Sequence, residues 1–161
     1  MVRGASNGRL LRLAIVLFVA VGVAACSKNK AADLAGNAVP GSAQDFQVNV
    51  GNRVLYTVDS SVLTAEGRSI LDRQAQWLKT YDKYQVTIQG HADERGTREY
   101  NLALGARRAT ATRNYLVSQG IPGSRLSTIS FGKERPEAVC ASESCWAQNR
   151  RTVTALAGGS S

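Results

Sequence analysis

The chain contains very little histidine: His91 is the single one among 161 residues. A catalytic zinc ion usually takes three protein ligands, so one histidine argues against a zinc hydrolase. The segment from His91 to Glu94 also contains the residue types of acid–base catalysis, which is the alternative interpretation. We favour a polar histidine, hydrogen-bonded at the edge of a binding site, and expect neither enzymatic activity nor a metal or other cofactor.

The chain also lacks a hydrophobic run long enough for a membrane helix. An uncharged, mostly apolar stretch covers residues 13–25, whereas a spanning helix needs about 20 residues. Arg3 and Arg12 precede this stretch, and small residues lie directly before Cys26. This pattern predicts a lipoprotein signal peptide over residues 1–25, with Cys26 as the lipidated residue after cleavage. An ordinary signal peptide, with Cys26 next to the cleavage site by chance, is the alternative.

Blocks of like charge are absent as well. The formal net charge is +8, but the charged residues are spread along the chain without a run of five or six of one sign. A basic domain could bind nucleic acid. The scattered charge and the expected export both argue against this, and we expect no nucleic-acid partner.

The three cysteines leave an even pair once Cys26 is set aside. Cys140 and Cys145 are separated by four residues, and an exported chain reaches an oxidising compartment. We predict a local disulfide between them, with two free thiols as the alternative. A cysteine–histidine metal site is not indicated, because His91 is far away in the sequence.

The composition divides the remaining chain into a tether, a domain and a tail. Residues 26–45 are rich in Ala, Gly, Asn, Ser and Lys and have no sustained apolar period, which is typical of a flexible tether. Residues 46–157 are expected to form one folded domain. Residues 158–161 are small and polar, as in a frayed end.

Apolar spacing within the domain predicts alternating strands and helices. Ile70, Leu71, Ala75 and Leu78 recur at helical spacing, and residues 85–89 alternate as a strand does. The expected elements, in order, are a strand at 53–58, a helix at 64–80, a strand at 85–89, a helix at 102–120, a strand at 126–131, a short helix or turn at 143–148 and a strand at 150–156. This β-α-β-α-β-(α)-β order predicts an α/β two-layer sandwich, with helices packed on a mixed sheet.

The candidate site lies where the second strand leads into the second long helix. Residues 90–101 read GHADERGTREYN, and residues 104–109 read LGARRA. Asn101 and Arg108 are seven residues apart and therefore project from one helix face, while Asp93 follows the strand. A carboxylate and a guanidinium across a shallow pocket suit a ligand with both an ammonium and a carboxylate group. A salt bridge between Asp93 and Arg108 that only fixes the loop is the alternative.

This pattern resembles the OmpA-like peptidoglycan-binding domain, and the resemblance covers residues 54–156. It implies that Asp93 accepts the ammonium group of meso-diaminopimelate in a peptidoglycan stem peptide and that Arg108 binds its carboxylate. It further implies that Asn101 holds the loop or contacts the ligand, and that Gly96 and Thr97 present backbone N–H groups at the helix start.

The resemblance also bears on residues outside this motif. Asp59 matches a family position that lines the same pocket, although a turn residue is an equal interpretation. Asn149, Arg150 and Arg151 match a family motif that we interpret mainly as structural or as charge at the rim.

The same resemblance implies a non-enzymatic lipoprotein that fastens the outer membrane to the cell wall, with its domain in the periplasm. It implies membership of the Tol envelope system, which acts in envelope integrity and cell division, with peptidoglycan, TolB and other Tol proteins as partners. By the same resemblance, Ser27 directly after Cys26 favours sorting to the outer membrane, because an aspartate at this position is the usual signal for retention in the inner membrane. A wall-binding module of another envelope machine and, less favoured, a cell-wall hydrolase are the alternatives.

Overall fold

The computed structural model describes residues 38–157. The expected signal peptide, the lipidation at Cys26, most of the expected tether and the tail at 158–161 lie outside these residues. Within residues 38–157, no helix is long and apolar enough to cross a membrane.

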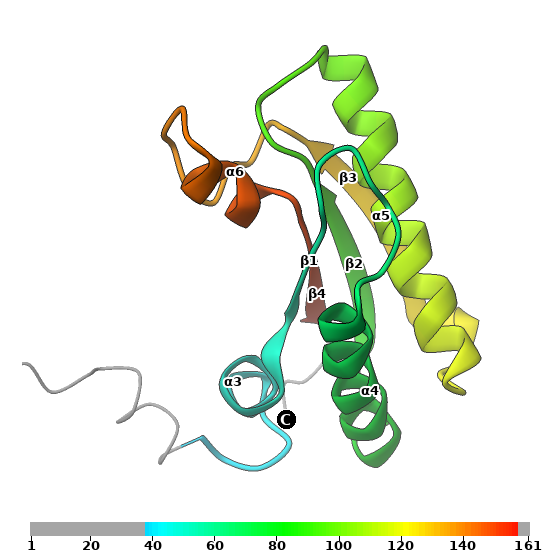
Figure 1. Cartoon of the computed structure of the whole chain (residues 1–161). Helices are drawn as coiled ribbons and strands as arrows, with labels where there is room; N and C mark the ends of the chain where they lie inside the picture. The colour runs from blue at the N-terminus through cyan, green and yellow to red at the C-terminus, as the bar shows by residue number, and fades with distance from the viewer. Residues whose placement is uncertain (1–37, 158–161) are drawn as a thin grey trace, which may run out of the picture. The chain divides into compact units, whose positions relative to one another are not determined.

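A four-stranded mixed sheet forms one layer of the domain (Figure 1). In the order β1-β4-β2-β3, β4 pairs antiparallel with both β1 and β2, and β2 pairs parallel with β3. Helices α4 and α5 form the second layer on one face of this sheet (Figure 1). The strands are β1 (Arg53–Leu55), β2 (Gln85–His91), β3 (Leu126–Gly132) and β4 (Arg151–Ala157). The predicted two-layer α/β sandwich is thereby confirmed.

The two long helices begin at threonine caps. The side chain of Thr64 accepts a hydrogen bond from the backbone N–H of Gly67 at 3.0 Å, which starts α4 (Ala65–Thr80). The side chain of Thr97 accepts a hydrogen bond from the backbone N–H of Tyr100 at 3.2 Å, which starts α5 (Arg98–Ser118). This helix begins four residues before residue 102, the start that apolar spacing suggests. Between them, α4, α5 and the sheet enclose a core of buried side chains that includes Leu71, Leu78, Ile88 and Leu116. Short helices η2 (Gly123–Arg125) and α6 (Glu143–Asn149) complete the unit.

Residues just before the sheet are folded, although their composition suggested a tether as far as residue 45. They form α3 (Ala43–Asp45) and the π-helical turn η1 (Phe46–Gly51). The carboxylate of Asp45 accepts a hydrogen bond from the Trp77 indole at 2.8 Å. The hydroxyl of Tyr84 donates to the carbonyl of Gly41 at 2.7 Å. The folded unit therefore begins a few residues before the expected boundary at residue 46.

Helix α5 crosses β2 at a contact between two glycines. A Cβ atom added to Gly90 would lie 1.9 Å from the carbonyl oxygen of Gly105. Only glycine fits at position 90 of this crossing. A Cβ atom added to Gly105 would in turn lie 2.4 Å from the Ser130 hydroxyl and 3.0 Å from the Gly90 carbonyl oxygen, so glycine at both positions permits the close packing. This contact sets the position of the first half of α5 against the end of β2.

Candidate functional site

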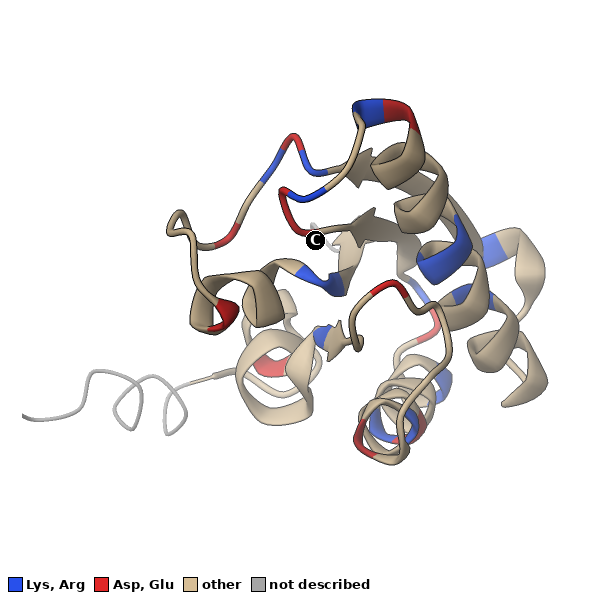
Figure 2. Ribbon diagram, turned by 45° about the horizontal axis from the view of Figure 1, so that its top comes forward, with Lys and Arg blue, Asp and Glu red and all other residues tan. Residues whose placement is uncertain are grey.

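A cavity of about 180 Å³ opens at the carboxyl end of β2. Three segments form its wall: the loop after β1, the loop after β2, and the first three turns of α5. Figure 2 shows charges of both signs on the loops at this end of the sheet. The lining residues are Val58, Asp59, Asp93, Arg95, Gly96, Tyr100, Asn101, Leu104 and Arg108.

Arg108 forms part of the cavity wall and has no exposed surface. Its Nε donates to the carbonyl of Ser60 at 2.7 Å, Nη1 to that of His91 at 2.8 Å, and Nη2 to that of Thr57 at 3.1 Å. Burial lowers the pKa of the guanidinium to about 10, so it stays protonated at neutral pH. Arg108 thus holds the loop after β1 against the end of β2, and two of its five N–H groups have no hydrogen-bond partner among the described residues.

Asp93 is 8% exposed and is surrounded by two arginines. The guanidinium of Arg95 donates two hydrogen bonds to the Asp93 carboxylate, from Nε to Oδ1 at 3.1 Å and from Nη2 to Oδ2 at 2.6 Å. Nη1 of Arg150 donates to Oδ2 at 3.3 Å. Burial alone would raise the pKa of this carboxyl, but the hydrogen bonds from Arg95 and Arg150 outweigh it and lower the pKa. No ion pair joins Asp93 to Arg108 in residues 38–157, so the salt-bridge alternative is not what the structure contains.

Asp59 supplies the more accessible carboxylate of the cavity. It is exposed, its backbone is in the left-handed region at φ 53°, and it accepts a hydrogen bond from the Tyr100 hydroxyl. That hydrogen bond raises the pKa of Tyr100, which keeps the hydroxyl protonated and donating. The sequence suggested Asp59 as a lining or turn residue, and the structure shows that it is both. Tyr100 was not singled out from the sequence.

Three other motif residues mainly shape the loop after β2. The buried Asn101 donates from Nδ2 to the carbonyl of Arg95 at 2.8 Å, so it holds the loop. Gly96 adopts φ +90°, which turns the chain into α5. Thr97 caps α5 and is not among the lining residues, so its side chain serves the helix start.

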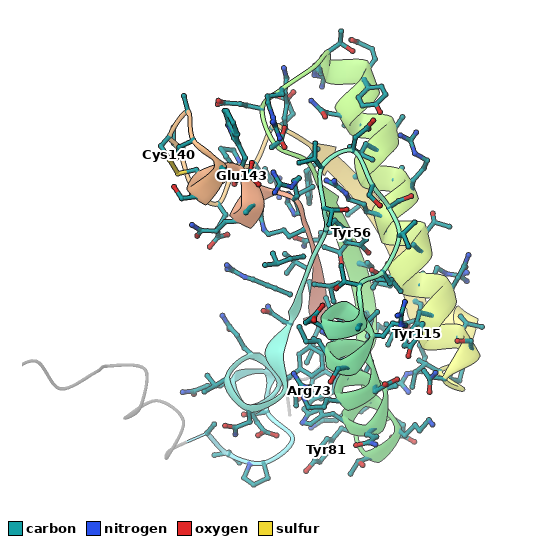
Figure 3. The ribbon with its side chains drawn as sticks, viewed as in Figure 1. Tyr56, Arg73, Tyr81, Tyr115, Cys140 and Glu143 are labelled. Carbon is teal, nitrogen blue, oxygen red and sulfur yellow. A yellow bond between two sulfur atoms is a disulfide. The ribbon has the colours of Figure 1, made fainter. Side chains whose placement is uncertain are left out.

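Helix α6 braces the outer side of this loop. Arg95 lies over the ring of Trp146, with Cζ 4.3 Å from the ring centroid, and the Trp146 indole donates to Glu94 at 3.0 Å. Arg150 is buried between Asp93 and Glu143. Figure 3 shows Glu143 on α6, beside the disulfide at Cys140. Arg150 therefore supports the site from within, whereas the sequence suggested a role in structure or at the rim.

The predicted disulfide is present in the structure. Cys140 and Cys145 are bonded, with their Cα atoms 5.7 Å apart. The bond closes the turn that leads into α6. The alternative of two free thiols does not hold for this structure.

His91 does not lie at the cavity. Its side chain is 2% exposed, packs against Phe131 on the sheet face away from α4 and α5, and has no hydrogen-bond partner on either ring nitrogen among the described residues. Burial lowers the pKa of His91 to about 4, so the ring is neutral at pH 7. The expectation of a hydrogen-bonded histidine at the pocket edge was wrong, because strand alternation places the ring behind the sheet. No cluster of three or more potential metal ligands occurs in residues 38–157.

Comparison with known proteins gives consistent matches. The sequence profile of the OmpA family matches residues 55–150. The peptidoglycan-associated lipoprotein of Rhizobium meliloti (strain 1021) is 57% identical over 155 residues, which cover 92% of this chain and 88% of the relative. That of Brucella melitensis biotype 1 is 56% identical, covering 91% of this chain and 92% of the relative.

Solved structures agree with these matches. The crystal structure of the peptidoglycan-associated lipoprotein from Burkholderia pseudomallei superposes with a TM-score of 0.64 and 40% identity, covering 66% of this chain and 90% of that one. The C-terminal domain of Helicobacter pylori MotB has a TM-score of 0.60 at 19% identity, covering 65% of this chain and 81% of that one, and shows the fold alone. The chain belongs to the OmpA family.

Proposed function

We propose that this protein is a non-enzymatic lipoprotein of the cell envelope whose domain binds peptidoglycan stem peptides noncovalently in the cavity at the end of β2. The observation that carries the proposal is the pairing of a buried, protonated Arg108 with two carboxylates, Asp59 and Asp93, around one cavity. The names of the relatives, peptidoglycan-associated lipoproteins, support the same ligand.

The ligand end that fits this arrangement is zwitterionic. The side chain of meso-diaminopimelate carries an ammonium and a carboxylate on one carbon. Its carboxylate would meet the remaining N–H groups of Arg108, and its ammonium would lie between Asp93 and Asp59. A planar guanidinium binds a carboxylate with two parallel hydrogen bonds, which fixes the ligand's orientation as well as its charge.

The remaining parts of the proposal concern the anchor and the partners. Lipid on Cys26 would hold the chain at the outer membrane, and two or more acyl chains suffice for stable anchoring. Residues 26–40 would then span about 20 Å as a coil and about 50 Å when extended, so the domain can reach a cell-wall layer. The protein would act in the Tol–Pal system, where TolB is the expected partner. A TolB surface covering the loops at Asp59 and Asp93 would exclude the stem peptide.

Sedimentation with purified sacculi tests the proposal. The full chain in detergent is spun with sacculi as wild type, as Asp93→Asn, and as the control Asp82→Asn. The control makes the same charge change in the exposed turn between α4 and β2, at the other end of the strand. We expect Asp93→Asn to bind at least tenfold more weakly and the control to bind as wild type does.

Two results would overturn parts of the proposal. Equal sedimentation of all three proteins would show that the site is misplaced. Release of soluble muropeptides by the wild type would show a hydrolase instead. Thermal unfolding of each variant checks that a loss of binding does not reflect a loss of folding.

A further inference from the structure

The side chain of Arg95 occupies the acidic side of the cavity. Its guanidinium takes up both carboxylate oxygens of Asp93, at 3.1 and 2.6 Å, and its backbone N–H adds a third contact at 3.2 Å. With Arg150 on the remaining side, Asp93 has no free position for a ligand's ammonium group. A ligand that binds Asp93 must therefore displace one of these two arginines.

Arg95 is the arginine that can move. Its side chain is 41% exposed, whereas that of Arg150 is 5% exposed and is fixed by contacts to Glu143 and to the carbonyl of Tyr56. Moving Arg150 would leave a buried charge without partners, which is costly. Moving Arg95 only transfers a half-exposed guanidinium further into solvent.

Arg95 also has a second contact that does not involve Asp93. Its guanidinium stacks on Trp146, whose indole is held in place by Glu94. Cation–π stacking on tryptophan contributes on the scale of an exposed ion pair. The side chain can therefore leave Asp93 while keeping its contact with α6.

We propose that Arg95 is a specificity-determining residue that acts as an internal competitor for the ammonium site at Asp93, an inference that rests on the proposed function. Without ligand, the guanidinium of Arg95 neutralises Asp93. A ligand with a free ammonium group replaces it, and Arg95 withdraws onto Trp146. A ligand with a carboxylate alone leaves Arg95 in place and meets no such competition. Arg95 therefore weakens binding only of ligands that carry the ammonium group, and it limits how strongly the cavity prefers zwitterionic diamino-acid ends over simple acids.

Calorimetry on the full chain in detergent tests this role. The probes are the tripeptide L-Ala-γ-D-Glu-meso-diaminopimelate and the same peptide with its distal amine acetylated. The variants are Arg95→Gln and the control Arg98→Gln, which makes the same charge change at an exposed ion pair with Glu134 outside the cavity. We expect Arg95→Gln to bind the free-amine peptide about two- to fivefold more tightly, as removal of one partly exposed competing ion pair allows. The acetylated peptide should gain nothing.

Each other outcome is decisive. Weaker binding by Arg95→Gln would show that Arg95 contacts the ligand directly, and unchanged binding would show that it does not compete; both overturn the inference. Failure of the folded wild type to bind the free-amine peptide would overturn the proposed function itself. Arg95→Lys, which keeps the charge but lacks the fork, should lie between wild type and Arg95→Gln, and it replaces the glutamine variant if that variant unfolds.

Discussion

Replacing Arg108 by lysine should loosen the loop after β1 while keeping the charge. The guanidinium donates to three carbonyls, those of Thr57, Ser60 and His91, and a lysine ammonium at the same depth can reach about one of them. Hydrogen bonds that involve a charged group contribute about 1.5–3 kcal/mol each, so losing two would cost about 3–6 kcal/mol. Because the loop at Thr57 is exposed and its carbonyl can bind water, we expect the lower end, about 3 kcal/mol.

Urea denaturation of the full chain measures this change. A loss of about 3 kcal/mol corresponds to a fall in Tm of roughly 10 °C for a domain of this size. The control is Arg107→Lys, one position along α5, where the side chain is exposed; it should change the free energy of unfolding by no more than about 0.5 kcal/mol. If Arg108→Lys were as stable as the control, the three carbonyl contacts would not hold the loop, and the view of Arg108 as part of the cavity frame would be refuted.

Three further predictions concern the scaffold. Unfolded His91 titrates near pH 6.5 and the folded ring near 4, so the free energy of unfolding should fall as the pH drops through this window, by up to about 1.4 kcal/mol per pH unit. In His91→Gln, urea titrations at pH 7 and pH 5 should show a smaller fall than in wild type; an equal fall would contradict the burial of a neutral ring. Replacing Cys140 and Cys145 together by serine should cost about 2 kcal/mol in urea, and no change would mean that the bond does not constrain the unfolded chain. Gly90→Ala should cost at least about 3 kcal/mol by thermal unfolding, because its Cβ would meet the Gly105 carbonyl, and a mild effect would show that α5 can shift.

Local pattern was sufficient to predict most of the sheet and both long helices. The apolar spacing of α4 and the alternation of β2 are properties of short windows, and the structure confirms both. The first strand ends at Leu55 and not at residue 58, because Arg108, some fifty residues away, draws the following carbonyls toward itself. A contact between residues so far apart in the sequence cannot be predicted from the spacing of apolar residues in a short window.

The folded segment before β1 was missed for a similar reason. Its small and polar residues are held by Trp77 and Tyr84, which lie 32 and 43 residues further along the chain from their partners. Composition alone therefore suggested a tether. Only Phe46, an aromatic residue at the edge of that segment, signalled that a core contact was near.

The sequence predicted which residues lie around the candidate site better than it predicted which residues they contact. Asp93 and Arg108 line one cavity as expected, together with Asp59, Gly96 and Asn101. Their partners were not foreseen. An arginine two residues after Asp93 could have suggested a local ion pair, but the contact from Arg150 depends on how β4 is inserted between β1 and β2.

The glycine contact between β2 and α5 has a consequence for the dimensions of the ligand cavity. Asp93 lies three residues beyond Gly90, and Arg108 lies three residues beyond Gly105. The backbone positions of both charged residues are therefore fixed relative to the same glycine contact. Neither glycine has a side-chain rotamer to change. The distance between the backbones of Asp93 and Arg108 is therefore insensitive to how core side chains such as Leu71 repack. Core substitutions that weaken the domain should leave ligand discrimination intact until the domain unfolds, so that selectivity and stability can vary independently in this molecule.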